Sequence, residues 1–131
     1  MKKTPLLNQA ISAVIAGMGH GDALVVADAG LPIPDDVVRI DLAVTAGVPA
    51  FMDVLKAVLS ELQVEQVILA EELKTKSPDM HTALLHYLSD MPVQYVSHEQ
   101  FKQTTSNAKA IIRTGEFTPY ANIILLAGVV F

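Results

Sequence analysis

The chain has no cysteine and no tryptophan, and only 18% of its 131 residues are charged. The lack of cysteine excludes a disulfide scaffold and any thiolate chemistry. The formal net charge is −5 and the isoelectric point is near 5.2. Nucleic acids and anionic membranes select for clustered lysine and arginine, so we expect neither as a partner.

Long apolar runs are also missing. The longest covers residues 123–131, far short of the roughly 20 residues that span a bilayer. The two N-terminal lysines and the apolar residues after them resemble a secretory signal. However, these apolar residues recur at helical spacing with polar residues between them, which predicts an amphipathic helix instead: Leu7, Ile11, Val14, Ile15 and Met18. We therefore expect an intracellular, cytoplasmic protein.

Apolar residues are what the chain has in excess. They make up 51% of it, and the mean hydropathy is +0.40. This composition excludes a disordered segment, and the length suits one domain over residues 1–131. Because charged residues fall below the usual share, we expect part of the apolar surface to be buried between subunits.

Helical and extended patterns alternate along the chain. Short continuous apolar runs predict strands buried on both faces; they cover residues 24–27, 37–42, 67–70, 93–96, 110–113 and 123–131. After the first helix, further helices are predicted over residues 49–63, 77–88 and 97–106, with Ser77 and Ser97 as N-caps. This alternation predicts an α/β fold with three αβα layers and a largely parallel sheet of about six strands.

Polar side chains follow several of these strands. Asp28 and Glu71 each come directly after a predicted strand, His98 lies two residues after another, and the loop over residues 114–122 follows a fourth. In open α/β sheets, ligands bind at the carboxyl ends of the strands. These groups form hydrogen bonds but lack charges of one sign, so they suit a small neutral polyol better than a phosphate or a nucleotide.

Cofactor and metal signatures are absent. Gly17, Gly19 and Gly21 form G-x-G-x-G, but they precede a strand, whereas a dinucleotide site needs glycines that open a helix. His81 and His86 are five residues apart and do not share one helix face, so they are interpreted as solvated helix histidines. We predict no metal and no cofactor.

Four residues in loops are candidates for a small-molecule site. His20 lies in a glycine-rich loop where backbone can approach a ligand closely, although a loop histidine is more often exposed than catalytic. Asp28 can equally bond the amides of its own turn. Tyr120 and Asn122 fit ordinary turn positions, and asparagine tolerates left-handed backbone. The residues alone thus indicate a site without naming its ligand.

Four segments follow one another along nearly the whole chain: Met18-Gly19-His20-Gly21-Asp22, Ala27-Asp28-Ala29-Gly30-Leu31-Pro32, Ser97-His98-Glu99, and Arg113-Thr114-Gly115-Glu116-Phe117-Thr118-Pro119-Tyr120-Ala121-Asn122. Together they resemble the D-ribose pyranase family. The related fucose mutarotases share the M-G-H-G-D loop, the aspartate, the T-G-E turn and the Tyr-x-Asn. The sequences around Asp28 and Phe117 favour the ribose branch.

The resemblance implies an isomerase of carbohydrate metabolism. It would interconvert the pyranose and furanose forms of D-ribose without a cofactor and supply the furanose to a downstream kinase. By resemblance, His20 is the proton donor, and Asp28, His98, Tyr120 and Asn122 bind the sugar. The family forms rings, a homodecamer of two pentamers in the ribose branch, with sites near subunit boundaries.

The chemistry suggests a role for each group. Our hypothesis is that His20 protonates the ring oxygen while Asp28 orients the imidazole or a sugar hydroxyl, because histidine titrates near neutral pH. Lys102 lies one helical turn after His98 and either faces the same pocket or is solvated. Two alternatives stay open: a non-catalytic ribose-binding accessory protein, and a mutarotase of another sugar such as L-fucose.

Overall fold

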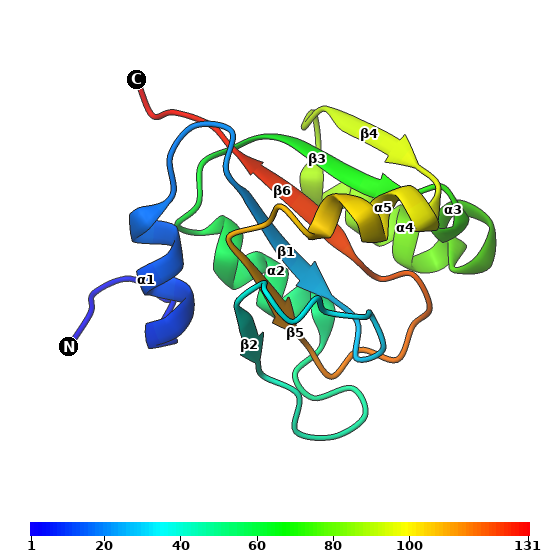
Figure 1. Ribbon diagram of the computed structural model, residues 1–131, viewed down its shortest axis with the longest axis horizontal. Helices are drawn as coiled ribbons and strands as arrows, with labels where there is room; N and C mark the ends of the chain where they lie inside the picture. The colour runs from blue at the N-terminus through cyan, green and yellow to red at the C-terminus, as the bar shows by residue number, and fades with distance from the viewer.

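One six-stranded sheet organises the protein, and its strands follow the order β2-β5-β1-β6-β3-β4 (Figure 1). The computed structural model describes residues 1–131. The strands are β1 (Ala23–Ala27), β2 (Arg39–Asp41), β3 (Val64–Ala70), β4 (Val93–Val96), β5 (Ala110–Arg113) and β6 (Ile123–Ala127). Apart from Arg113 at the end of β5, the three central strands β5, β1 and β6 consist of apolar residues, most of them buried, as the continuous apolar runs predict.

The sheet is largely parallel, with one reversed strand. β1 and β2 each pair in parallel with β5, and β3 pairs in parallel with β4. β6 lies antiparallel to both of its neighbours, β1 and β3. The loop over residues 114–122 is too short for the helical crossover that a parallel return requires, so the chain enters β6 in the opposite direction.

Helices cover both faces of the sheet, which confirms the three-layer prediction. They are α1 (Gln9–Gly17), α2 (Phe51–Leu59), α3 (Glu72–Lys76), α4 (Pro78–Leu88) and α5 (His98–Thr105). The larger core cluster joins α1, α2, α3 and α4 to one face, and the smaller cluster joins α5 and the loop after β1 to the other. Figure 1 shows α5 in front of the sheet and α2 and α4 behind it. No helix combines the length and the hydrophobicity needed to span a bilayer.

Several predicted bounds were wrong. The last strand ends at Ala127 rather than residue 131, because its neighbour β1 begins at Ala23 and pairs no further along β6. The helix predicted over residues 49–63 is only α2, and the strand predicted over residues 37–42 is only β2. Leu7 lies before α1 and is exposed instead of lying on its buried face.

The two predicted serine caps have different outcomes. Ser97 caps α5, since its side chain accepts a hydrogen bond from the Gln100 N–H at 3.1 Å. Ser77 makes no side-chain cap to α4. Its hydroxyl instead donates to the Pro119 carbonyl at 2.7 Å, which ties α4 to the loop between β5 and β6.

Candidate active site

Asp28 is locked in place by its own turn and by a distant asparagine. One carboxylate oxygen accepts the Gly30 N–H at 2.9 Å, and the other accepts the Asn122 Nδ2–H at 2.9 Å. The Asp28 N–H in turn donates to Asn122 Oδ1 at 2.8 Å. Asn122 is fully buried, with 0% of its surface exposed. Its side chain therefore serves as a clamp on Asp28 and presents no surface to a ligand.

His98 and Tyr120 form the opposite wall. Their rings meet edge to face with centroids 5.0 Å apart, and His98 stacks on Phe101 in α5. Tyr120 has φ +62, in the left-handed region where side chains other than glycine are uncommon. The sequence predicted that Asn122 tolerates this region, but the strained residue is Tyr120. Its unusual backbone turns the phenol ring toward His98.

The position of His98 is set from two sides. It is the first residue of α5, and its backbone N–H donates to the two oxygens of the Glu72 carboxylate at 3.0 and 3.2 Å. Its Nδ1 is buried without a hydrogen-bond partner. With the lone pair on Nδ1 and the hydrogen on Nε2, the ring would have no buried N–H without an acceptor. In this tautomer His98 can donate one hydrogen bond from Nε2.

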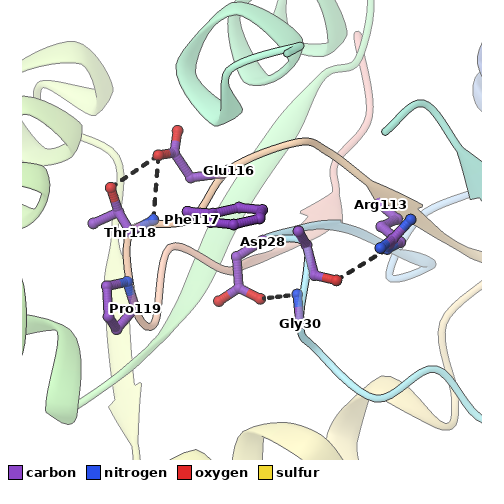
Figure 2. A pocket seen from close by; sticks show the side chains of 8 residues that line it. Asp28, Gly30, Arg113, Glu116, Phe117, Thr118 and Pro119 are labelled. Carbon is purple, nitrogen blue, oxygen red and sulfur yellow. Dashed lines mark hydrogen bonds between the residues drawn. The ribbon is translucent and has the colours of Figure 1, made fainter. Parts of the chain in front are cut away.

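Two adjoining hollows meet at Asp28. One, of about 250 Å³, is lined by Asp28, Gly30, Leu31, His98, Pro119 and Tyr120. The other, of about 390 Å³, is lined by Asp28, Ala29, Gly30, Arg113, Glu116, Phe117, Thr118 and Pro119. Figure 2 shows the Asp28 carboxylate between Gly30 and Pro119, with the Phe117 ring nearby. Asp28, Gly30 and Pro119 belong to both hollows, which therefore form one continuous candidate site.

Arg113, the positively charged residue that lines the larger hollow, is already paired with other groups of the chain. Arg113 Nε donates to the Ala29 carbonyl at 3.0 Å, and its guanidinium contacts the Asp41 carboxylate at 3.1 and 3.2 Å. The pKa of Asp41 lies below its ordinary value because the Ala43 N–H donates to it and Arg113 pairs with it. The positive charge is directed at Asp41, which suits a neutral ligand better than an anionic one.

The turn over Thr114, Gly115 and Glu116 holds the loop that lines the larger hollow. The fully buried Thr114 donates from its hydroxyl to the Ala27 carbonyl at 2.7 Å, at the end of β1. The Glu116 carboxylate accepts the Phe51 N–H at 3.0 Å, at the start of α2, and the Thr118 hydroxyl at 2.8 Å. A Cβ on Gly115 would lie 2.6 Å from the Thr45 carbonyl oxygen, so only glycine fits there. The turn thus positions the loop.

His20 lies at the other end of β1. Its loop precedes Ala23, whereas Asp28 follows Ala27, so β1 alone separates them by about 13 Å. The imidazole is 61% exposed, and its Nε2 lies 2.9 and 3.0 Å from the Glu65 carboxylate oxygens. The interpretation that Asp28 orients this imidazole is therefore wrong within a single chain.

The loop around His20 is held rigidly. Gly21 has φ +81, which favours glycine. Asp22 Oδ2 accepts the Gly19 N–H at 2.9 Å, and Asp22 Oδ1 lies 3.4 Å from Lys109 Nζ. The Gly19 N–H and Lys109 hold the pKa of Asp22 below its ordinary value. These contacts explain most of the M-G-H-G-D segment as a scaffold for His20.

His81 differs from the predicted solvated histidine, whereas His86 is exposed as predicted. His81 is half-buried, and its Nε2 lies 2.8 Å from the Tyr95 hydroxyl. Burial lowers the pKa of His81, and the charge of Lys74 lowers it further.

Two further residues named from the sequence lie outside the hollows. Glu71 is exposed and pairs with Lys74 at 2.9 Å, while its neighbour Glu72 contacts His98. Lys102 pairs with Glu99 at 2.6 Å and lines a separate hollow. Lys102 therefore does not face the Asp28 site within this chain.

Comparison with known proteins gives the family. The model of the RbsD / FucU transport protein family matches residues 1–130. The chain belongs to this family. Among curated members, it is 56% identical to a D-ribose pyranase of Clostridium novyi over 131 residues, which is 100% of both chains. It is 53% identical to a D-ribose pyranase of Geobacillus thermodenitrificans, covering 100% of this chain and 99% of the relative.

Solved structures of the family agree. Bacillus subtilis RbsD complexed with D-ribose superposes with a TM-score of 0.97 at 49% identity, over 100% of both chains. The fucose mutarotase of Streptococcus pneumoniae in complex with L-fucose gives 0.78 at 25% identity, over 100% of both chains. Within the RbsD / FucU family, this chain is thus more similar to the ribose-bound member.

Proposed function

We propose that this chain is a D-ribose pyranase, an isomerase that interconverts the pyranose and furanose forms of D-ribose. The full-length match to the ribose-bound RbsD, with a TM-score of 0.97, carries the proposal. The curated relatives named D-ribose pyranase support it at 51–56% identity. We expect it to act in the cytoplasm, where the furanose would supply a sugar kinase.

The groups in the two hollows suit a pentose. The Asp28 carboxylate can accept a hydrogen bond from a sugar hydroxyl, and Nε2–H of His98 can donate one to a sugar oxygen. Tyr120 supplies a hydroxyl and the edge of a ring. Asn122 was predicted to touch the sugar, but its complete burial assigns it to Asp28, which it holds by two hydrogen bonds.

The reaction needs two coordinated proton transfers. In ring opening, the oxygen on C5 gains a proton as its bond to C1 breaks, and the anomeric hydroxyl loses a proton as the C1 carbonyl forms. Closure through the oxygen on C4 reverses both transfers and gives the furanose. A histidine can donate and accept at neutral pH. We assign these transfers to His20, which ends each cycle in the protonation state in which it began.

His20 reaches a sugar beside Asp28 only from a second copy of the chain. Within one chain, β1 separates the two residues. We propose a ring-shaped homodecamer in which His20 of one subunit faces the hollow between Asp28 and His98 of its neighbour.

Exposed apolar residues support this assembly. Large side chains that monomers normally bury are exposed on loops and at the C-terminal end: Leu7, Val44, Val48, Phe117, Val130 and Phe131. Phe117 lies on the edge of the candidate site, which places an apolar contact next to the hollow that needs a second chain. Subunit contacts would bury these groups.

Exchange NMR tests the function directly. Saturation transfer between the pyranose and furanose signals of D-ribose measures their interconversion, and we expect the protein to raise the rate well above that in buffer. His20→Ala should abolish the gain while leaving ribose binding. A non-catalytic accessory protein predicts no gain in the first place. Equal or higher activity on L-fucose would instead support the fucose branch.

A further inference from the structure

The imidazole of His20 contacts one other side chain, which belongs to a residue with no role in the proposed function described above. Glu65, near the start of β3, places both carboxylate oxygens within 3.0 Å of His20 Nε2. β3 and the loop before β1 lie on either side of the end of β6, at the same end of the sheet (Figure 1). The contact joins parts of the chain that are 45 residues apart.

The backbone holds both members of this pair. The Gly21 N–H donates to the Ala127 carbonyl at 2.8 Å, and the Gly128 N–H donates to the Gln63 carbonyl at 2.9 Å. A Cβ on Gly128 would lie 3.1 Å from the Cβ of Glu65. The end of β6 thus fixes the His20 loop on one side and the start of β3 on the other, and both meet at the His20–Glu65 contact.

The other charges near this loop are already engaged. The Asp22 carboxylate is directed at the Gly19 N–H and at Lys109 Nζ. Glu65 is therefore the carboxylate that contacts the imidazole. Because both side chains are about half exposed, the pair adds little to the stability of the fold. Its consequence is the orientation of the ring.

We propose that Glu65 is a positioning residue for His20. Its carboxylate accepts the hydrogen of Nε2, which leaves Nδ1 as the nitrogen that exchanges protons with the sugar. A base that is oriented by a carboxylate on its second nitrogen is a recurring arrangement in acid–base catalysis. When Nδ1 takes up a proton, the carboxylate also stabilises the positive ring. This assignment rests on the proposed function.

Substitution of Glu65 separates this role from a structural one. Glu65→Gln keeps the size but removes the charge, and Glu65→Asp keeps the charge on a shorter side chain. Glu61→Gln is the matched control, because Glu61 is a partly buried glutamate paired with Lys2 rather than with a histidine. The ring-exchange rate is measured over a range of ribose concentrations to obtain kcat and KM.

We expect Glu65→Gln to lower kcat by about tenfold to a hundredfold with little change in KM. Glu65→Asp should recover part of the loss, and Glu61→Gln should match the wild type. A kcat for Glu65→Gln equal to that of Glu61→Gln would overturn the proposal, as would a loss confined to KM.

The protonation of the ring gives a readout that does not depend on activity. In protein labelled with ¹⁵N at histidine, we expect the His20 resonances to show hydrogen on Nε2 in the wild type. In Glu65→Ala they should show a mixture of the two tautomers. An unchanged tautomer would overturn the proposal even if the enzyme is active. If the wild type fails to accelerate ribose exchange, the proposed function fails, while the ¹⁵N spectra still decide whether Glu65 orients His20.

Discussion

Asn122→Asp is the sharpest perturbation of the candidate site. In the wild type, the Asn122 Nδ2–H donates to Asp28 Oδ2 at 2.9 Å, and Asn122 Oδ1 accepts the Asp28 N–H at 2.8 Å. Aspartate keeps the acceptor and removes the donor. Two carboxylate oxygens then face each other within about 3 Å at a fully buried position, where both cannot be ionised.

The structure sets the size and the sign of the effect. A hydrogen bond to a charged group is lost, which costs about 1.5–3 kcal/mol of folding free energy. To avoid two adjacent charges, the folded variant keeps one proton that the separated carboxyls of the unfolded chain release above about pH 4. The folded state then binds more protons than the unfolded state. Stability is therefore retained at low pH and lost as the pH rises, by at most about 1.4 kcal/mol per pH unit.

Urea unfolding at several values between about pH 5 and pH 8 measures this directly. The matched control is Asn107→Asp, which makes the same substitution at an exposed position after α5. We expect Asn122→Asp to be less stable than this control and to lose further stability as the pH rises. If both variants show the same free energy of unfolding at every pH, the clamp between Asn122 and Asp28 does not exist.

Three further predictions follow from single contacts. Gly115→Ala should lower the free energy of unfolding in urea by at least about 2 kcal/mol, because the added Cβ meets backbone oxygens. Gly17→Ala, with open space around it, should stay within about 1 kcal/mol of the wild type. Equal losses in the two variants would show that backbone atoms do not crowd Gly115. The lowered pKa of His81 means that its contribution to stability is present above about pH 6.5 and is lost as the pH falls. His81→Gln should therefore reduce the dependence of the unfolding free energy on pH between about pH 5 and 7. His86→Gln is the control, and the same pH profile in both variants would contradict the prediction. Tyr120→Gly should raise the KM for ribose, because the ring beside His98 is removed while glycine adopts the left-handed backbone without strain; an unchanged KM would exclude the ring from the site.

The strands of the sheet were predicted well from the sequence because a strand that is buried on both faces consists of consecutive apolar residues. All six strands were located, although β2 and β6 are shorter than expected. The reversed direction of β6 was not predicted, since a continuous apolar run does not indicate whether a strand pairs parallel or antiparallel with its neighbours. α3 was missed because it is a short, polar helix in which only Leu73 is buried.

The site was partly predictable for a topological reason. Asp28 and His98 follow strands whose carboxyl ends lie at the same edge of the sheet, so the rule for open α/β sheets brought them together correctly. Glu65, Glu72 and Glu116 were not singled out as positioning residues. Each contacts a residue that is far away in the sequence, and nothing local distinguishes such a glutamate from a solvated one.

The same limit explains the location of His20. The sequence placed His20 and Asp28 eight positions apart and suggested one cluster, but a buried strand lies between them and sends them to opposite ends of the sheet. Only the fold shows that the two residues lie at opposite ends of β1, and this separation is why we propose that a common site draws them from different chains.

Complementation between two inactive variants shows whether one site draws His20 and Asp28 from two chains. His20→Ala and Asp28→Asn are each expected to leave ribose exchange near the rate in buffer. When the two variants are co-expressed and assemble at random, about a quarter of the shared sites receive both an intact His20 and an intact Asp28. If the site is shared between chains, the mixed protein regains about that share of the wild-type rate. A mixed protein that assembles normally but stays as inactive as either variant alone would contradict a shared site.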